Sequence, residues 1–483
     1  MAGTRRARTV AVMTNSQLPS SDAAWLHMDS PANPMVVNAV IWFDERIDSS
    51  GAREILETRL VDEFPRFRQR VSELLGRPPR FEDDPEFDVD QHLHRLALPA
   101  PGDRAALEEL VSDLITPPLD PTRPLWHVYL IEGFGEGCAL LFRIHHCIAD
   151  ALALARVMLS LTDAEPDVAI APAPPAPARG AGGRLRALTR PATGALSAGR
   201  RVVGAVAHEG IETLLHPQHA AHLAATAGRD TGTLAKLLTA PADTRSPLRG
   251  SLHGSRRVAW STPFPLDRVK RPGRRSGATI NDVLVAALTG ALHTYLTDRD
   301  SSIEELHIMV PFNLRPLDRP LPCDLGNDFG LILLALPVGL MDAGERLREV
   351  KARMDAIKHS HEGPIAYGML SAIGLTPPTV EDRLISFFSS KASAVVTNVP
   401  GPREQVYFAG SPVQGVLVWA PCSGSMGMTV SIFSYQGEVT AGFMADTGLV
   451  PDPQPLVAAF DAELKALCRG TRTTRRRAVG AHG

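Results

Sequence analysis

A stretch of 20 residues, 164–183, divides this chain into two long parts. It is rich in proline, alanine and glycine, and such a sequence has too few large apolar side chains to form a packed core. The parts before and after it each alternate apolar runs of strand length with amphipathic helical stretches. Because the chain has 483 residues, 44% of them hydrophobic, each part is long enough to bury its own core. The sequence therefore predicts an α/β protein of two halves joined by a linker.

Changes in composition set the predicted boundaries. After the linker comes an alanine-rich, helix-prone segment with several arginines near its start, and the chain ends with a basic stretch after a helical pattern. No sequence repeat relates the halves. We predict a disordered lead-in at 1–17, a first domain at 18–163, the linker at 164–183, a helical basic connector at 184–250, a second domain at 251–468 and a basic tail at 469–483.

Charge and cysteine content exclude several classes of protein. The net charge of -3 gives no overall attraction to nucleic acid, and the basic segments carry no aromatic or motif context that would recognise it. The five cysteines are odd in number and form no C-x-x-C pair, which predicts a reducing cytoplasm. The N-terminal arginines precede too few apolar residues for a secretory signal. The longest apolar run, 329–341, contains Pro337 and Gly339 and is too short to span a bilayer, so we interpret it as a buried strand.

The sequence HHCIAD, residues 145–150, is the strongest candidate for chemistry. It follows an apolar strand pattern, and side chains alternate between the faces of a strand, so His145 and His146 should point in opposite directions. Asp150 stands where a helical pattern begins and is suited to cap that helix or to pair with a cation. A neutral imidazole can accept the proton of a hydroxyl that attacks an activated carbonyl. The spacing alone leaves open whether both histidines are purely structural.

Other catalytic arrangements fit less well. Cys147 points away from His146 in an extended chain and has apolar neighbours, and the sequence around Ser425 is not a G-x-S-x-G elbow. Two groups of histidines lack cysteine or carboxylate ligands at metal-binding intervals. We predict structural or surface roles and no metal site for these groups, which are His92 and His94, and His216, His219 and His222.

The motif is accompanied by blocks along nearly the whole chain, from about residue 18 to 467. As a set they resemble the bacterial bifunctional wax ester synthase/acyl-CoA:diacylglycerol acyltransferases, especially those of actinobacteria. The blocks are, in order, SSDAAWLHMDSPANPM, FDVDQHLHRLALPAPGD, PLDPTRPLWHVYLIEG, RIHHCIADALA, GATINDVLVAALTGAL, VPFNLRP, LGNDFGLILLALPVG, TNVPGP and GSMGMTVSIFSYQGEVTAGFMAD.

This resemblance implies two chloramphenicol-acetyltransferase-like halves with mixed sheets and a substrate tunnel at their interface. It also implies that His146 is the general base and that His145 is a supporting neighbour. Asp150 would orient the loop, and we expect Arg315 to be its partner. The motif of the family usually has Gly after the Asp, and here Ala151 stands in that place. A position that needs positive φ would be disturbed by this change, whereas a position that merely begins a helix would tolerate it.

Two shorter blocks of the family also map to this chain. Its Pro-Leu-Trp block corresponds to Pro124, Leu125 and Trp126, and its Asn-Asp block to Asn281 and Asp282. Core packing is the simpler interpretation of Trp126. For Asn281 two interpretations stay open, a substrate contact and the N-cap of a helix.

The resemblance predicts transfer of a long-chain acyl group from acyl-CoA, as co-substrate, to diacylglycerol or a long-chain alcohol, with no cofactor. We therefore expect a cytoplasmic protein that visits the inner membrane face or lipid droplets, with the arginines of 184–201 and of the tail attracted to anionic lipid. One rival is an acyltransferase with a different hydroxyl or amine acceptor. Another is a catalytically weak lipid- or acyl-binding protein, if Ala151 disturbs the site.

Overall fold

The structure is a computed structural model that describes residues 16–74, 77–166, 168, 241–315, 321–358, 362–376, 378–422 and 424–469. Most of the predicted linker, connector and tail therefore lies outside the described residues. The predicted lead-in is corrected at its end, because β1 (Ser16–Gln17) pairs antiparallel with β4 (Arg80–Asp83). With β3 (Gln69–Ser72) these strands form a small sheet, and α1 (Ser20–His27) follows β1.

The first large sheet has six strands in the order β13-β14-β2-β7-β6-β5. Its central strands, β14, β2, β7 and β6, are antiparallel, and every residue of β7 is buried. These strands are β2 (Val36–Phe43), β5 (Leu93–Ala97), β6 (Trp126–Phe134), β7 (Gly137–His145), β13 (Tyr407–Phe408) and β14 (Ser411–Trp419). The helices of this half are α2 (Ser49–Ile55), α3 (Arg104–Ile115) and α4 (Ala151–Ser160), with a π-helical turn (Leu56–Val61) and 3-10 turns (Pro65–Arg68, Val89–Gln91).

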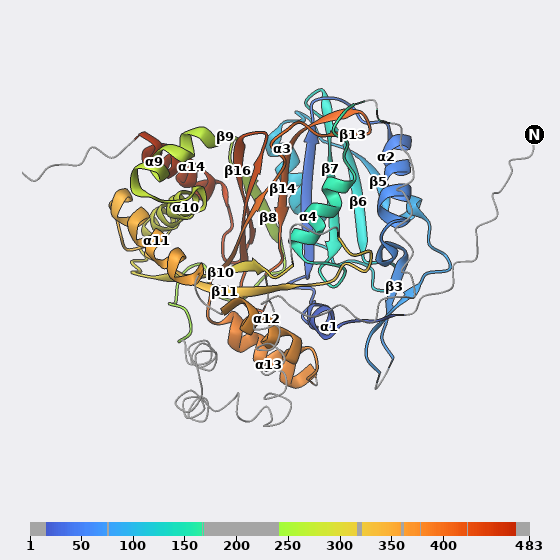
Figure 1. The fold of residues 1–483 in the computed structure, drawn as a ribbon, viewed down its shortest axis with the longest axis horizontal. Helices are drawn as coiled ribbons and strands as arrows, with labels where there is room; N and C mark the ends of the chain where they lie inside the picture. The colour runs from blue at the N-terminus through green and yellow to red at the C-terminus, as the bar shows by residue number, and fades with distance from the viewer. Residues whose placement is uncertain are drawn as a thin grey trace, which may run out of the picture.

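The second large sheet follows the order β11-β10-β12-β15-β16-β8, and β9 also pairs with β16. Helices α9, α10, α11 and α14 lie together on one side of it, whereas α12 and α13 lie near β11 and α1 (Figure 1). The strands are β8 (Arg256–Trp260), β9 (Phe264–Pro265), β10 (Leu306–Asn313), β11 (Phe329–Leu336), β12 (Ala394–Pro400), β15 (Met428–Tyr435) and β16 (Glu438–Asp446). The helices are α9 (Leu266–Ser276), α10 (Ile280–Thr297), α11 (Ala343–Lys358), α12 (Glu362–Ile373), α13 (Pro378–Ser389) and α14 (Gln454–Arg469).

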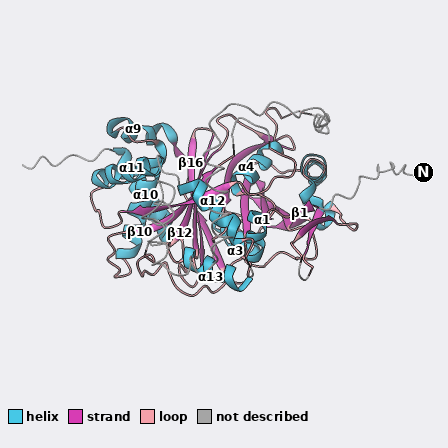
Figure 2. Ribbon diagram, turned by 60° about the horizontal axis from the view of Figure 1, so that its bottom comes forward, coloured by secondary structure: helices cyan, strands magenta, loops and turns pink. Residues whose placement is uncertain are grey.

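The two halves are not contiguous in sequence, which corrects the predicted domain boundary. Strands β13 and β14 come from the second half but extend the first sheet, with β14 antiparallel to β2. The sequence of β14 contains Pro412 and Gly415, which obscured its strand pattern. A bulge between Val413 and Gly415 absorbs the irregularity, and a side chain at Gly415 would collide with the ring of Trp42. Strand β14 also lies against β15 and β16 of the second sheet, so strands of both halves meet in the middle of the molecule (Figure 2).

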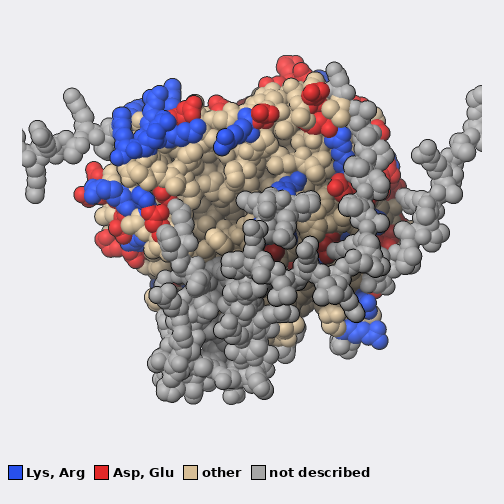
Figure 3. Space-filling model, in the orientation of Figure 1, with Lys and Arg blue, Asp and Glu red and all other residues tan. Residues whose placement is uncertain are grey.

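The predicted buried strand at 329–341 is confirmed for its first part, because β11 ends at Leu336 and Met341 is exposed. Among the described residues, no helix combines the length and the apolar character that a membrane crossing requires. Lysine and arginine side chains gather over α9 on the face seen in Figure 3, at the upper left.

Candidate active site

His146 lies in the tight loop between β7 and α4, and contacts elements of both halves. Its side chain is only 2% exposed. The imidazole stacks on the indole of Trp25 in α1, with ring centroids 4.0 Å apart, and contacts the ring of Phe329 in β11 at 5.6 Å. Its backbone N–H donates to the carbonyl of Met35, 2.8 Å away, and its own carbonyl accepts from Asn327 Nδ2 at 2.8 Å. The loop and the ring are therefore both fixed.

The surroundings of His146 keep its imidazole uncharged. Burial, and then the neighbouring His145, lower the pKa of His146 to about 3. Nδ1 of the ring is buried and has no hydrogen-bond partner among the described residues. A buried, neutral imidazole with an unpartnered nitrogen is equipped to accept a proton from a bound substrate.

His145 points elsewhere and is engaged by its neighbours. Its Nδ1 accepts a hydrogen bond from the backbone N–H of Cys147 at 3.1 Å, and its Nε2 lies 3.6 Å from Oδ1 of Asp29. The side chain is nearly fully buried. Since both ring nitrogens face protein groups, the geometry favours a supporting role for His145.

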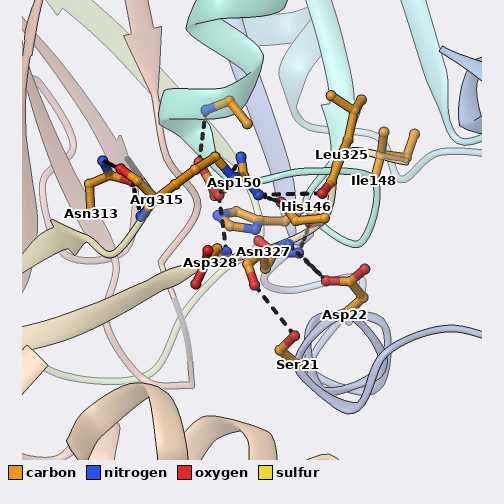
Figure 4. Close-up of polar contacts among 12 residues, drawn as sticks. Ser21, Asp22, His146, Ile148, Asp150, Asn313, Arg315, Leu325, Asn327 and Asp328 are labelled. Atoms are coloured by element: carbon orange, nitrogen blue, oxygen red, sulfur yellow. Dashed lines mark hydrogen bonds and ion pairs between the residues drawn. The ribbon is translucent and has the colours of Figure 1, made fainter. Parts of the chain in front are cut away.

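Asp150 anchors the other end of the loop (Figure 4). Its Oδ1 caps α4 by accepting from the N–H of Ala153 at 2.7 Å, and its Oδ2 accepts from the N–H of Asp328 at 3.2 Å. The predicted ion pair with Arg315 is confirmed, with Nη1 3.5 Å from Oδ2. The guanidinium of Arg315 also donates to the carbonyls of Leu325 and Gly326. Asp150 therefore ties the histidine loop to the segment before β11.

A second anchor was not predicted from sequence. Asp22 in α1 is fully buried, with Oδ2 2.8 Å from Nη1 of Arg66. Its Oδ1 accepts from both the backbone N–H and the Nδ2 of Asn327, each at 2.9 Å (Figure 4). Arg66 also donates to the carbonyls of Cys147 and Ile148 in the loop, at 3.1 and 2.8 Å. Asp22 and Asn327 are 305 residues apart, so no local spacing could connect them, although both lie in blocks that carry the family resemblance.

The Pro-Leu-Trp block supports the site from the core. Trp126 is fully buried and its indole N–H donates to the carbonyl of Phe67 at 2.7 Å. The carbonyl of Leu125 accepts from the N–H of His145 at 2.9 Å, which fixes the end of β7. Pro124 is also buried. Core packing, the simpler interpretation of Trp126, therefore agrees with its surroundings.

The N-cap interpretation of Asn281 is wrong. Thr279 caps α10 instead, in a reciprocal pair with Asp282 in which each side chain accepts from the backbone N–H of the other residue. This leaves the side chain of Asn281 free to face a cavity, where its Oδ1 accepts from Nδ2 of Asn398 at 2.6 Å.

Ala151 is the first residue of α4 and is not among the residues with positive φ. Its methyl group packs against a buried cluster that includes Met309, Ala420 and Met426. The helix start therefore accommodates alanine without backbone strain.

Two cavities flank β10 and β11. The first, of about 100 Å³, lies between these strands and helices α12 and α13, and is lined by Trp25 and almost entirely by apolar side chains. The second, of about 590 Å³, lies beneath the start of α10 and is lined by Asn281, Phe312 and Asn398 among others. Among the described residues, no group of three or more His, Cys, Asp or Glu side chains could hold a metal ion. His216, His219 and His222 lie outside the described residues.

Comparisons with known proteins cover nearly the whole chain. Residues 18–284 match the family model of the wax ester synthase/diacylglycerol acyltransferase catalytic domain, and residues 325–468 match that of the WS/DGAT C-terminal domain. A putative diacylglycerol O-acyltransferase of Mycobacterium tuberculosis is 30% identical over 476 residues, covering 93% of this chain and 90% of that protein. A probable diacylglycerol O-acyltransferase of the same organism is 29% identical over 92% of this chain and 97% of its own length.

Solved structures share the fold at lower identity. The wax ester synthase/diacylglycerol acyltransferase from Marinobacter aquaeolei VT8 has a TM-score of 0.65 and 23% identity, covering 94% of this chain and 98% of that chain. The first condensation domain of the CDA synthetase has a TM-score of 0.55 and 15% identity, covering 94% and 95%. The predicted fold of acyltransferase-like halves is thus confirmed.

Proposed function

Because the chain belongs to the wax ester synthase/diacylglycerol acyltransferase family, we propose that it transfers a long-chain acyl group from acyl-CoA to a hydroxyl of diacylglycerol or a fatty alcohol. His146 is the general base. The observation that carries this assignment is its buried, uncharged imidazole, whose Nδ1 has no partner among the described residues. No cofactor besides the co-substrate acyl-CoA enters the proposal.

The reaction is a direct transfer. The hydroxyl proton moves to the imidazole of His146 as the oxygen attacks the thioester carbonyl carbon. The tetrahedral intermediate then collapses, the C–S bond breaks, and the thiolate of CoA takes the proton from the imidazolium. Neither a metal nor a covalent enzyme intermediate is required, because the thioester is already activated.

The apolar cavity beside Trp25 suits an alkyl chain. Trp25 both lines this cavity and stacks on His146, so a chain placed there would end next to the base. Each buried CH₂ contributes about 0.8 kcal/mol to binding, so alkyl chains supply most of the affinity that such a site needs. At about 100 Å³ the cavity must widen to accept a long chain.

Purified protein incubated with palmitoyl-CoA and either dioleoylglycerol or hexadecanol tests the proposal. We expect release of CoA matched by formation of triacylglycerol or wax ester. Transfer only to some other hydroxyl or to an amine would favour the rival acyltransferase. Binding of palmitoyl-CoA with no transfer to any acceptor would favour a lipid-binding protein, and either result would contradict the proposal.

The value of kcat/KM should not fall at weakly acidic pH, as it would for a histidine base with an ordinary pKa. With its pKa lowered from 6.5 to about 3, His146 stays in its base form throughout the weakly acidic range. An unshifted histidine would lose about tenfold in its base form one pH unit below its pKa, whereas kcat/KM here should stay level from about pH 8 to 5.5. The measurement is kcat/KM for palmitoyl-CoA across this range at constant ionic strength. A decline with an apparent pKa near 6.5 would contradict the burial argument.

We further propose that the protein associates peripherally with the cytoplasmic membrane face or with lipid droplets, since both acceptors are lipids. The arginines of 184–201 and of the tail, which we expected to favour such contact, lie outside the described residues. Flotation with anionic phosphatidylglycerol vesicles tests this association, and failure to float at low salt would argue against it.

A further inference from the structure

The outer face of α9 is strongly basic, and none of the steps above uses it. Five lysine and arginine side chains are exposed on this helix of 11 residues, against one acidic side chain, Asp267. Asp267 is paired with Lys270 at 2.8 Å. Among the described residues, the four arginines have no carboxylate within ion-pair distance; they are Arg268, Arg271, Arg274 and Arg275.

This helix stands at the edge of the larger cavity. Leu266, the first residue of α9, lines that cavity, and so do Thr279, Ile280 and Asn281, which follow just after the helix ends at Ser276. The start of α10 lies in the same region, where the carboxylate of Asp282 offsets the positive end of the helix dipole. The basic helix α9 therefore adjoins the border of this cavity.

The cavity also reaches strands that border the histidine, because β10 and β12 pair only at Ile308–Ala394 and Met309–Val395 and both line the cavity beyond these pairs. Phe312, one of its lining residues, pairs across the β10–β11 ladder with Gly330. The residue before Gly330 is Phe329, which points to the opposite face of β11, where its ring contacts the imidazole of His146. The interior also offers the amides of Asn281 and Asn398 between apolar walls. The cavity therefore adjoins the cationic helix α9, and one of the strands in its wall, β11, contacts the proposed base on its other face.

On the basis of the proposed function, we propose that α9 binds the phosphorylated nucleotide end of acyl-CoA and that this cavity receives its pantetheine arm. CoA carries a diphosphate and a 3′-phosphate, and arginines hold such groups by charge-assisted hydrogen bonds. The pantetheine arm presents two amides on a flexible apolar chain, which matches the asparagines and the apolar walls.

A lipid surface is the less favoured ligand of α9. The apolar residues Val269 and Pro272 face inward and are buried. The described large apolar side chains that are exposed lie outside this helix, at Leu74, Val168, Phe312, Met341 and Leu375. The helix thus presents charge without any apolar side chain to insert into a bilayer.

The test compares palmitoyl-CoA with palmitoyl-pantetheine, which lacks the nucleotide, in full-length protein carrying Arg271→Ser, Arg274→Ser and Arg275→Ser together. We expect the KM for palmitoyl-CoA to rise about tenfold at low salt, as three charge-assisted contacts are lost. The KM for palmitoyl-pantetheine should change less than about twofold, and the difference should shrink as salt is added. A matched control removes three exposed arginines of the first half by Arg46→Ser, Arg70→Ser and Arg77→Ser, and should leave both KM values unchanged.

An unchanged KM for palmitoyl-CoA, or an equal rise for both donors, would overturn the proposal. Loss of flotation on phosphatidylglycerol vesicles with an unchanged KM would assign α9 to a membrane surface instead. If the unaltered protein transfers to no acceptor, the proposed function fails and calorimetric binding of CoA and of pantetheine decides alone. In that case weaker binding of CoA by the α9 variant supports the nucleotide site, and equal binding rejects it.

Discussion

Replacing His146 with alanine should lower kcat/KM for ester formation by a factor of roughly 10² to 10⁴, the contribution of a general base. The imidazole is the group placed to take the hydroxyl proton, and without it the alcohol must attack unassisted. The loss should appear equally with dioleoylglycerol and hexadecanol, since both present a hydroxyl to the same group. Initial rates of CoA release and of ester formation measure it.

The control must separate lost chemistry from lost packing, because the ring of His146 also stacks on Trp25 at 4.0 Å. His92 is a suitable match: it is 1% exposed, and its ring stacks on Trp126 at 4.5 Å. His92→Ala should destabilise the fold to a similar degree and keep kcat within a few-fold. Full activity in a folded His146→Ala protein would remove the basis of the mechanism.

Locally encoded features of the site were predictable from the sequence. Alternation of apolar residues places β7 and the opposite directions of His145 and His146, and the capping preference of aspartate places Asp150 at the start of α4. The pairing of Asp150 with Arg315 was also expected, but from the family resemblance and without any spacing argument. These features depend on a few neighbouring residues or on a recognised motif.

Features that depend on distant pairings were not predictable in the same way. Strand β14 gains its place from its pairing with β2, far away in sequence, and its proline and glycine conceal the strand pattern. The N-cap was one of two interpretations left open for Asn281, but Thr279, two residues earlier, caps α10 with Asp282 as its partner. The contact of Asp22 with Arg66 and Asn327 exists only after both halves have folded together.

That contact leads to the second large effect, a loss of stability in Asp22→Asn. Burial raises the pKa of Asp22, although Arg66 and Asn327 act to lower it. The buried ion pair therefore adds little net stability compared with the two charges in water. Removing only the charge of Asp22 destabilises the fold, because Arg66 is then a buried cation without its partner carboxylate. The side chain of Arg66 is only 8% exposed. Breaking a buried pair in this way costs about 3–5 kcal/mol. Activity should decline as well, since Arg66 and Asn327 hold the carbonyls of Cys147 and His146 in the catalytic loop.

Thermal unfolding of three variants makes this expectation specific. Glu132→Gln breaks the ion pair with Arg95, in which the side chain of Glu132 is 43% exposed and that of Arg95 is 59% exposed. This change should lower the free energy of unfolding by less than about 1 kcal/mol. Asp22→Asn should lower the melting temperature far more than this control. The double variant Asp22→Asn, Arg66→Met removes the stranded cation along with its partner and should be at least as stable as Asp22→Asn alone, because no unpaired charge is left in the interior. A double variant that is less stable than Asp22→Asn alone would contradict this expectation, because removal of the stranded cation would then cost stability instead of restoring it.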